Sequence, residues 1–310
     1  MWHDTPMLNF LPSFVLTFFV PTLIALNTVF WFSLFLPIIA LKLLFFFAPG
    51  VQRWGSKVLM KLGSYWISGN SGVFYLTQKT RWEITGLEQL DMDKSYLVIS
   101  NHLSWTDIFV LQHVFNHRIP FLKFFLKKEL IWVPLLGVAW WALDFPFMKR
   151  FSKAHLEKHP EDRGKDMETT RKYCERFKDY PVSVINFLEG SRFTPEKKQK
   201  QNSPYRYLLK PKAGGIAHAL SILGDSFNAV LDVTLIYPGN DNKSLIWQLF
   251  EGKIPKIVVN INHRPVPENT TGKNYQEDEA YRTQIQNWVN TLWQDKDAYI
   301  ASYHQTKAPL

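Results

Sequence analysis

The stretch that decides the fold of this chain is residues 96–107, which read Tyr96-Leu97-Val98-Ile99-Ser100-Asn101-His102-Leu103-Ser104-Trp105-Thr106-Asp107. Its first five residues form a short apolar run, which predicts a buried strand. A helical pattern begins after Trp105 and continues to about Phe115. A strand that passes through a short loop into a helix is the building unit of an α/β fold.

The same stretch carries a histidine and a carboxylate in the pattern His102-x4-Asp107. A histidine at the end of a strand, next to a carboxylate, can act as a general base with an orienting partner. A spacing of five does not place two residues on one face of a helix, where residues three or four apart meet. The side chains therefore meet only if His102 lies on the loop and Asp107 in the first helical turn. Taken alone, the pattern fits a core histidine and a helix-start aspartate equally well.

Strands and helices alternate on both sides of this stretch. We expect an amphipathic helix at 51–80 and a strand at 81–85. Further along, we expect strands at 182–187, 229–236 and 256–261, and helices at 106–115, 167–178, 214–223 and 277–303. The alternation predicts the α/β class, with a largely parallel sheet flanked by helices. Residues 51–310 contain no repeat and no long linker, so we expect them to form a single domain.

The first fifty residues differ from the rest of the chain. Residues 8–47 contain a single charged residue, Lys42. A helix that spans a bilayer needs about 20 apolar residues, so this run has the length for two. The pair Asn27-Thr28 interrupts it near its middle. We therefore expect residues 1–50 to form a two-helix membrane anchor, which either crosses the bilayer as a hairpin or inserts into one leaflet. A cleaved signal peptide does not fit, because the start lacks basic residues and the run is too long.

The residues after this run indicate the compartment of the remaining chain. Arg53, Lys57 and Lys61 follow the apolar run closely. By the positive-inside rule they place residues 51–310 in the cytoplasm. The chain has one cysteine, Cys174, which excludes an internal disulfide and fits a reducing compartment.

The net charge of +9 belongs to residues 51–310, since the first fifty residues carry one acid and one base. A basic domain beside a bilayer is attracted to anionic lipid. The aromatic residues cluster in apolar runs instead of alternating with cations, and no zinc-finger or RNP-type motif is present. We therefore expect a membrane surface and acidic substrates as partners, and no nucleic acid.

Two further segments place arginine after an apolar run. Phe187-Leu188-Glu189-Gly190-Ser191-Arg192 follows a predicted strand, and its glycine permits a turn. Arginine in such a place suits phosphate, because its planar group binds two oxygens and keeps its charge. The second segment is Phe147-Met148-Lys149-Arg150. Each segment alone also fits an ordinary turn with a surface arginine. A third, Val233–Pro238, is a buried strand stopped by proline, which we interpret as a wall of the site.

The sequence predicts no metal and no cofactor. The pairs His113/His117 and His155/His159 have helical spacing, but neither contains the glutamate of a zinc-binding His-Glu-x-x-His motif. The pair Gly214-Gly215 lacks the surroundings of a nucleotide-binding loop. No Gly-x-Ser-x-Gly motif is present, which argues against a serine hydrolase.

Taken in order, these segments resemble the 1-acylglycerol-3-phosphate acyltransferase (PlsC-type) family, and are closest to its bacterial inner-membrane YihG-like branch. The resemblance covers about residues 89–238, behind an apolar N-terminus typical of the family. Four blocks carry it: Asn101-His102-x4-Asp107, Phe147-Met148-x-Arg150, Phe187-Leu188-Glu189-Gly190-Ser191-Arg192, and the strand ending at Pro238. The last block lacks its usual leading proline. Other departures are Asp144 for glycine, Leu188 for proline and Ser191 for threonine, and they leave the acceptor open.

The resemblance implies a glycerophosphate acyltransferase-like fold and a role for the first block. His102 is implied to be the general base that activates a lipid hydroxyl, and Asp107 to hold the ring nitrogen that does not react. An apolar stretch at 121–141 is implied to line the acyl channel. The lysines within 197–200 are implied to meet an acidic donor.

The later blocks are implied to bind the acceptor. Arg192 and Arg150, with Lys149 beside it, are implied to hold the acceptor phosphate. Glu189 is implied to orient the acceptor or to brace Arg192. The turn through Gly190 and Ser191 is implied to contact the substrate, with backbone amides there as candidates for the oxyanion site.

The implied function is that of a membrane-bound enzyme of the bacterial inner membrane, with its catalytic domain facing the cytoplasm. It transfers an acyl group from acyl-CoA or acyl-carrier protein to a lysophospholipid acceptor. The expected reaction converts 1-acylglycerol-3-phosphate to phosphatidic acid. Alternatives are another lysolipid acceptor, such as lysophosphatidylglycerol or a cardiolipin precursor, a non-catalytic lipid-binding protein, and a hydrolase that uses His102 on water.

Overall fold

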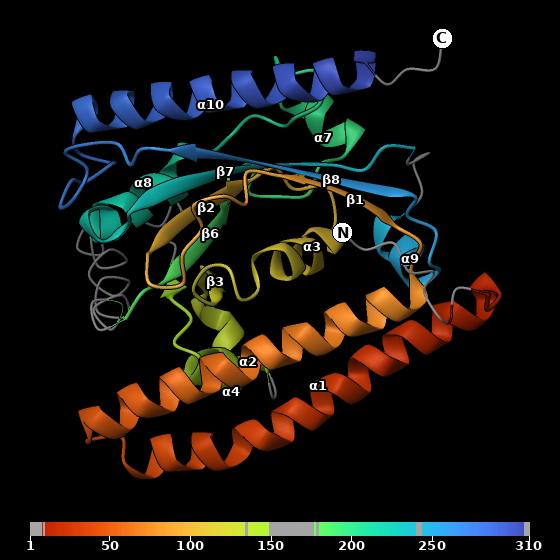
Figure 1. The fold of residues 1–310 in the computed structure, drawn as a ribbon. Helices are drawn as coiled ribbons and strands as arrows, with labels where there is room; N and C mark the ends of the chain where they lie inside the picture. Colours follow the sequence, from red (N-terminus) through yellow and green to blue (C-terminus); the bar gives the residue numbers. More distant parts are fainter. Residues whose placement is uncertain are drawn as a thin grey trace.

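A sheet lies in the middle of the molecule, with helices on both faces and a long helical hairpin beneath it (Figure 1). The computed structural model describes residues 8, 10–133, 136–148, 177, 180–239 and 244–306. Within these residues the main sheet has six strands, in the order β1 (Arg81–Thr85), β8 (Lys256–Arg264), β7 (Ala229–Ile236), β2 (Tyr96–Ser100), β6 (Ser183–Phe187) and β3 (Leu122–Phe124). All neighbouring strands are parallel except β7 and β8, which confirms the predicted largely parallel sheet.

The remaining elements surround this sheet. A two-stranded piece joins β4 (Leu126–Lys127) to β5 (Phe147–Met148). The described α-helices are α1 (Ser13–Leu44), α2 (Pro49–Thr77), α3 (Thr106–Phe115), α4 (Leu136–Ala142), α7 (Pro195–Lys200), α8 (Ala213–Leu223), α9 (Leu245–Phe250) and α10 (Glu279–Thr306). Two short 3-10 helices are η1 (Lys128–Trp132) and η4 (Gly224–Ser226). The predicted elements occur close to their expected bounds, and the expected helix at 167–178 lies outside the described residues.

The strand β2 is central because it is buried on both faces. Its alternate side chains point to opposite sides, as the two-residue period of a strand requires. Leu97 and Ile99 pack into the core under α8 and α10, whereas Tyr96 and Val98 pack into the core formed with α2, α3 and α9. This double burial explains why β2 reads as a continuous apolar run. The residues that follow it therefore start from a fixed position at the carboxyl edge of the sheet.

The apolar N-terminal run forms one helix, so the expectation of two helices within residues 1–50 is wrong. Asn27 lies in the middle of α1, where its side-chain amide donates to the Trp66 carbonyl and to Asn70 Oδ1, both at 2.9 Å. The Trp66 indole in turn donates to Thr28 Oγ1 at 3.0 Å. The polar pair is therefore a contact between helices, not a turn. The partner of α1 is α2, which begins at Pro49 inside the region assigned to the soluble domain.

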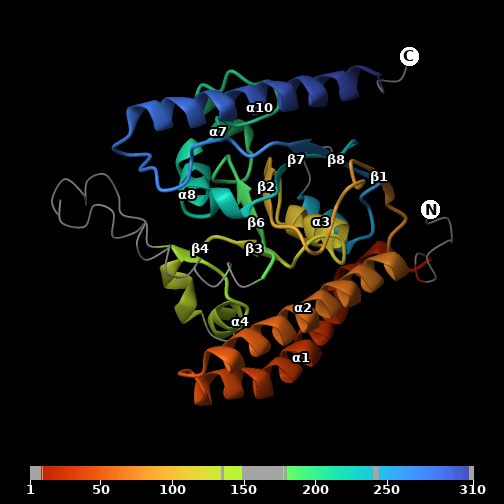
Figure 2. The ribbon, with the colours of Figure 1, turned by 60° about the vertical axis from the view of Figure 1, so that its left-hand side comes forward.

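The helix α2 lies between α1 and the sheet domain (Figure 2). Its residues 64–71 form hydrogen bonds to the end of α3 and the residue after it. The Asn116 amide donates to the Ser64 carbonyl and to Ser68 Oγ, and His113 bonds to Ser71 Oγ. The hairpin therefore runs along the domain surface. Its outer side is formed by exposed apolar side chains of α1 and of the α1–α2 corner, including Phe14, Phe18, Val29, Leu44 and Phe46.

Candidate functional site

His102 and Asp107 meet as their spacing predicts. The strand β2 ends at Ser100, His102 lies on the loop, and Asp107 lies in the first turn of α3. The distance from His102 Nδ1 to Asp107 Oδ2 is 2.8 Å. Because a carboxylate only accepts hydrogen bonds, Nδ1 carries the proton, and Nε2 is the basic nitrogen of the neutral ring.

The Asp107 carboxylate is wholly buried and saturated with donors. Its Oδ2 also accepts the backbone N–H groups of Leu103 at 2.6 Å and Ser104 at 2.9 Å. Its Oδ1 accepts the hydroxyl of Tyr237 at 2.7 Å. Hydrogen bonds to a charged group are stronger than those between neutral groups. Asp107 therefore stabilises both the loop conformation and a positive charge on the His102 ring.

Tyr237 is a site residue that the sequence analysis missed, because we interpreted the segment ending at Pro238 as a wall. Tyr237 directly follows β7, which is parallel to β2, so the two strand ends lie at the same edge of the sheet. Burial and the charge of Asp107 raise the pKa of Tyr237 well above its ordinary value, so it remains a donor. Asn101 joins the same two segments, since its side chain exchanges two hydrogen bonds with the backbone of Leu235.

A row of aromatic rings leads away from His102. The His102 ring stacks on Phe187, with centroids 4.0 Å apart. Phe187 stacks on Phe124 at 6.3 Å, and Phe124 on Phe145 at 6.4 Å. The last two belong to the apolar cluster formed by α1, α2 and α4, which also contains Phe121. The side of His102 that faces the hairpin is therefore apolar, as expected of a path for a hydrocarbon chain.

The turn after β6 places Glu189 beside the pair. Gly190 has a positive φ of 66°, which L side chains rarely adopt, and its N–H donates to the Phe187 carbonyl at 2.9 Å. Glu189 is fully buried, and neither carboxylate oxygen makes a hydrogen bond of standard geometry to a described residue. Burial, together with the charge of Asp107, raises the pKa of Glu189 from 4.5 to about 8, although the positive charge of Lys296 opposes the rise. Glu189 is therefore largely protonated at neutral pH.

Arg192 is exposed and lies close to the loop of the first block. Its guanidinium lies 5.1 Å from the centre of the Trp105 ring, an arrangement that favours a cation. Within the described part of the chain no ion pair joins it to Glu189, so the structure does not support the expected brace between them. Ser191 is partly buried in the turn. Lys149 and Arg150 of the second block lie outside the described residues.

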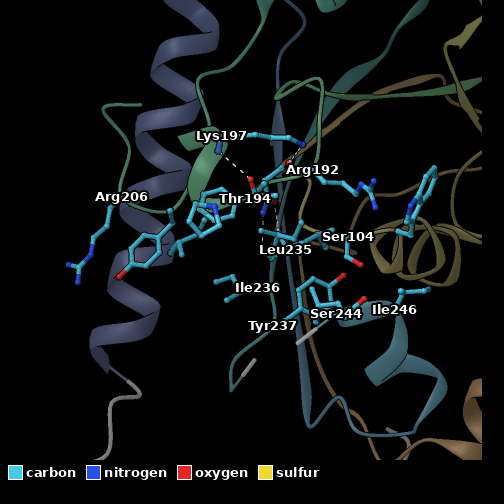
Figure 3. A pocket seen from close by; sticks show the side chains of 18 of the residues that line it. Ser104, Arg192, Thr194, Lys197, Arg206, Leu235, Ile236, Tyr237, Ser244 and Ile246 are labelled. Carbon is cyan, nitrogen blue, oxygen red and sulfur yellow. Dashed lines mark hydrogen bonds between the residues drawn. The ribbon is translucent and has the colours of Figure 1, made fainter. Parts of the chain in front are cut away.

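A pocket of about 730 Å³ adjoins this site (Figure 3). It lies at the carboxyl ends of β2 and β7, between α7, α9 and α10. Trp105, Arg192 and Tyr237 are among the residues that line it. The loop that carries His102 is tied to the pocket wall, because the Phe193 N–H donates to the His102 carbonyl at 2.7 Å.

The histidines at helical spacing have structural partners. His113 bonds to Ser71 and packs on the Trp82 ring, and burial lowers its pKa to about 4. His117 bonds to Ser68 Oγ at 3.0 Å. Each ring therefore joins the α3 region to α2. The other pair, His155 and His159, lies outside the described residues.

Comparison with known proteins finds relatives over the segment that carries the site. The family described as Acyltransferase matches residues 81–238, which include His102, Asp107, Glu189, Arg192 and Tyr237. The chain is 32% identical over 193 residues to mouse 1-acyl-sn-glycerol-3-phosphate acyltransferase gamma, covering 59% of this chain and 46% of that protein. It is 27% identical over 224 residues to Arabidopsis thaliana 1-acyl-sn-glycerol-3-phosphate acyltransferase 3, covering 67% and 53% respectively.

The chain spans about half the length of the curated relatives it matches. A solved structure, the 1-acyl-sn-glycerophosphate acyltransferase PlsC from Thermotoga maritima, covers 93% of this chain and 96% of its own. Its TM-score is 0.50 at 17% sequence identity, so the likeness is one of fold. The helices α9 and α10, which form two walls of the pocket, lie beyond the matched residues 81–238.

Proposed function

The chain belongs to the acyltransferase family, and on that premise we propose that it transfers a fatty acyl group from a thioester donor to the free hydroxyl of a lysophospholipid. The observation that carries the proposal is the His102–Asp107 contact, with the basic ring nitrogen left available. The proposed acceptor is 1-acylglycerol-3-phosphate, the compound named for the curated relatives, and the product is phosphatidic acid.

In the proposed reaction, His102 Nε2 takes the proton of the acceptor hydroxyl while that oxygen attacks the thioester carbonyl. The imidazolium that forms is stabilised by Asp107 through the Nδ1 hydrogen bond. A new ester bond forms, the carbon–sulfur bond breaks, and the proton passes from Nε2 to the departing thiolate. No acyl-enzyme is needed, because a thiolate is already a good leaving group. Proton transfer by a positioned base contributes about 10²–10⁴ to a rate.

The acceptor phosphate is proposed to bind Arg192, helped by Lys149 and Arg150. Arg192 is exposed at the pocket rim, and its fork suits a phosphate. The backbone amide of Ser191, which follows Gly190 in the turn, is proposed to stabilise the oxyanion of the tetrahedral intermediate, whereas the Gly190 N–H is bound to the Phe187 carbonyl. Because the raised pKa of Glu189 keeps it largely protonated, Glu189 does not add a second negative charge beside the His102–Asp107 pair.

Two departures from the family's usual residues have structural explanations. Asp144 is buried, accepts the Tyr180 hydroxyl at 3.0 Å and lies 3.4 Å from Lys42 Nζ. Leu188 is 1% exposed and packs in the core under α8. Neither side chain gives a reason for an altered acceptor. This favours 1-acylglycerol-3-phosphate over lysophosphatidylglycerol or a cardiolipin precursor. Of the other departures, Ser191 retains the hydroxyl of threonine, and the missing leading proline of the last block has no structural explanation.

We also propose that the α1–α2 hairpin inserts into one leaflet of the bacterial inner membrane from its cytoplasmic side. Support comes from the apolar outer face of α1 and from α2, whose inner face is bound to the domain. An α1 that runs along the domain surface cannot also project through the bilayer. The acceptor is a lipid, so this placement puts His102 at the headgroup level.

The test is turnover by purified protein with a panel of lysolipids, offered with acyl-CoA and with acyl-carrier protein and analysed by mass spectrometry. We expect phosphatidic acid as the main product. His102→Ala is expected to lower turnover by about 10³, because the base is lost. His117→Asn serves as the control, since asparagine tolerates the positive φ of 59° at this site and no role in transfer is assigned to it. Unchanged turnover in His102→Ala, or no acylation of any lysolipid, contradicts the proposal.

A further inference from the structure

A lysine lies in the core behind the active site, a place where this residue type is rare. Lys296 belongs to α10, which covers the face of the sheet opposite the α1–α2 hairpin (Figure 1), and its side chain is wholly buried. Burying an ammonium group costs free energy unless charged and polar partners replace the lost water. The helix lies beyond the matched residues 81–238, so the family's motifs do not explain this lysine.

Among the described residues, the hydrogen-bond and ion-pair partners of Lys296 belong to the strand β7. Its Nζ donates to the Val233 carbonyl at 2.5 Å and to Thr234 Oγ1 at 3.1 Å. It also lies 2.6 Å from Asp232 Oδ1, and the Asp232 side chain is itself buried. The ammonium is therefore bound to three consecutive residues of one strand, through two side chains and one backbone carbonyl.

The same strand leads to the residue that completes the catalytic pair. The strand β7 ends one residue before Tyr237, whose hydroxyl donates to Asp107 Oδ1 at 2.7 Å. Val233, whose carbonyl accepts the bond from Lys296, pairs with Ser100, the last residue of β2. The loop that carries the general base begins directly after β2. Lys296 is therefore attached to the part of the sheet from which both segments of the site emerge.

The charges around Lys296 show that the ion pair acts as a unit. Burial lowers the pKa of the Lys296 ammonium, whereas the carboxylate of Asp232 opposes the fall. The ammonium also acts on Glu189 beside the catalytic pair, where it opposes the rise in the pKa of that buried acid. Arg264 Nε lies 4.0 Å from Asp232 Oδ2, and its guanidinium binds Asp295 at 2.9 Å. Removing either Lys296 or Asp232 alone therefore leaves the other as a buried charge without its nearest partner.

We propose that Lys296 is a positioning residue of the active site, which holds the end of β7 so that the Tyr237 hydroxyl meets Asp107. The inference rests on the acyl transfer proposed above and adds a residue from outside the matched segment. Lys296 acts through the strand and through Tyr237, and not by contact with the reacting atoms. Asp232 has the companion role, because its charge allows the ammonium to be buried at this place.

The test uses the full-length protein and separates stability from positioning. Lys296→Met keeps the length of the side chain and removes the ammonium, but it leaves Asp232 buried and unbalanced. The double variant Lys296→Met/Asp232→Asn removes both charges, so its unfolding temperature is expected to return close to that of the native protein. Thr234→Val is a milder variant, which removes one acceptor of Lys296 and strands no charge. The control is Tyr281→Phe, which removes a buried hydrogen bond from the same helix α10.

Turnover of palmitoyl-CoA with 1-acylglycerol-3-phosphate is measured for each variant, alone and combined with Tyr237→Phe. We expect the double variant to lower kcat about tenfold and to leave both KM values within twofold, because the base loses its alignment mainly in the transition state. Adding Tyr237→Phe to the double variant is expected to lower kcat less than twofold further, since both changes act through one hydroxyl. Thr234→Val is expected to lower kcat about threefold in the native background and not in Tyr237→Phe. Tyr281→Phe is expected to leave kcat within twofold.

A folded double variant that turns over at the native rate overturns the assignment, because the buried pair then serves only the fold. Losses that multiply to about a hundredfold when Tyr237→Phe is added also overturn it, because Lys296 then does not act through Tyr237. If the double variant does not fold, Thr234→Val decides by the same comparison of backgrounds. In each of these cases the native protein still transfers acyl groups, so the proposed function stands. If the native protein transfers none, the proposed function fails and the assignment fails with it.

Discussion

At the scale of single residues, the site depends on one carboxylate that collects donors from two distant segments. Asp107 is bound by His102, Leu103 and Ser104 from its own loop and by Tyr237 from the end of β7, 130 residues away. The orientation of the His102 ring is therefore set by the packing of β2 against β7. A change at Tyr237 is expected to affect the base without touching it.

Tyr237→Phe tests this dependence. It removes one hydrogen bond to a charged group, which is worth about 1.5–3 kcal/mol, and leaves the ring in place. We expect kcat to fall at least about tenfold, with KM values little changed, because the imidazolium loses support mainly in the transition state. Tyr281→Phe is the control, since that buried hydroxyl bonds to the Ala217 carbonyl far from the site. It is expected to lower stability and not kcat, and equal kcat losses contradict the argument.

Glu189 is expected to make stability depend on pH. Its pKa is about 8 in the folded protein and about 4.5 when unfolded, so the folded state holds a proton that the unfolded chain has released. The free energy of unfolding therefore falls as the pH rises from 4.5 to 8, by about 1.4 kcal/mol for each pH unit and on the order of 4 kcal/mol in all.

In the Glu189→Gln variant this position cannot ionise, so the free energy of unfolding does not fall with pH for this reason. We expect native protein and variant to unfold at similar temperatures at pH 5, and the variant to unfold at a clearly higher temperature at pH 8.5. Thermal unfolding of the detergent-solubilised protein measures the difference. Glu88→Gln, at an exposed position, is the control. If the gap between Glu189→Gln and native protein does not widen with pH, Glu189 is not protonated in the folded state.

At the scale of elements, the sequence pattern predicted the strands and helices whose formation depends mainly on neighbouring residues. The strand β2 and the helix α3 occur at the expected bounds, because an apolar run and a helical repeat are each read from neighbouring residues. The contact between His102 and Asp107 followed from the strand–loop–helix order. Tyr237 was missed because its partner lies in a different segment, and nothing in its own neighbours shows which strand end it faces.

The α1–α2 hairpin shows a second way in which a prediction from neighbouring residues fails. Asn27 looked like a break in an apolar run, since a polar amide in such a place is costly without partners. The partners exist in α2, where Trp66 and Asn70 accept its hydrogen bonds. A polar residue within a long apolar helix indicates either a turn or a contact with another helix, and the sequence alone does not distinguish them.

The helix α10 extends the site beyond the matched residues. Three residues on one of its faces reach the segment after Glu189 and the middle of β7. Trp293 donates to the Leu209 carbonyl, Asp297 accepts the N–H groups of Arg206 and Tyr207, and buried Lys296 lies 2.6 Å from Asp232. The backbone of residues 206–209, part of which lines the pocket, is therefore fixed by the last described helix.

At the scale of the whole molecule, we propose that the hairpin sets the orientation of the domain at a membrane. The proposal that α1 enters one leaflet is tested in sealed vesicles with the domain facing outward. Single cysteines replace Phe10 and Ala48 at the two ends of α1, in a Cys174→Ser background. We expect a membrane-impermeant thiol reagent to label both from outside, because both ends lie on the domain side. A cysteine at exposed Lys94 is the positive control, and labelling at only one end of α1 contradicts the proposal.

The order of strands also bears on how the chain folds. Among the described strands, the edge strand β1 pairs with β8 alone, so that Arg81 lies opposite Lys256. During synthesis β1 therefore waits without a partner until about 175 further residues have been made. Contacts between such distant residues slow folding, because the chain must close a long loop before they form. The apolar α1 is complete long before then, so the nascent chain is expected to reach the lipid first and to close its sheet while already attached.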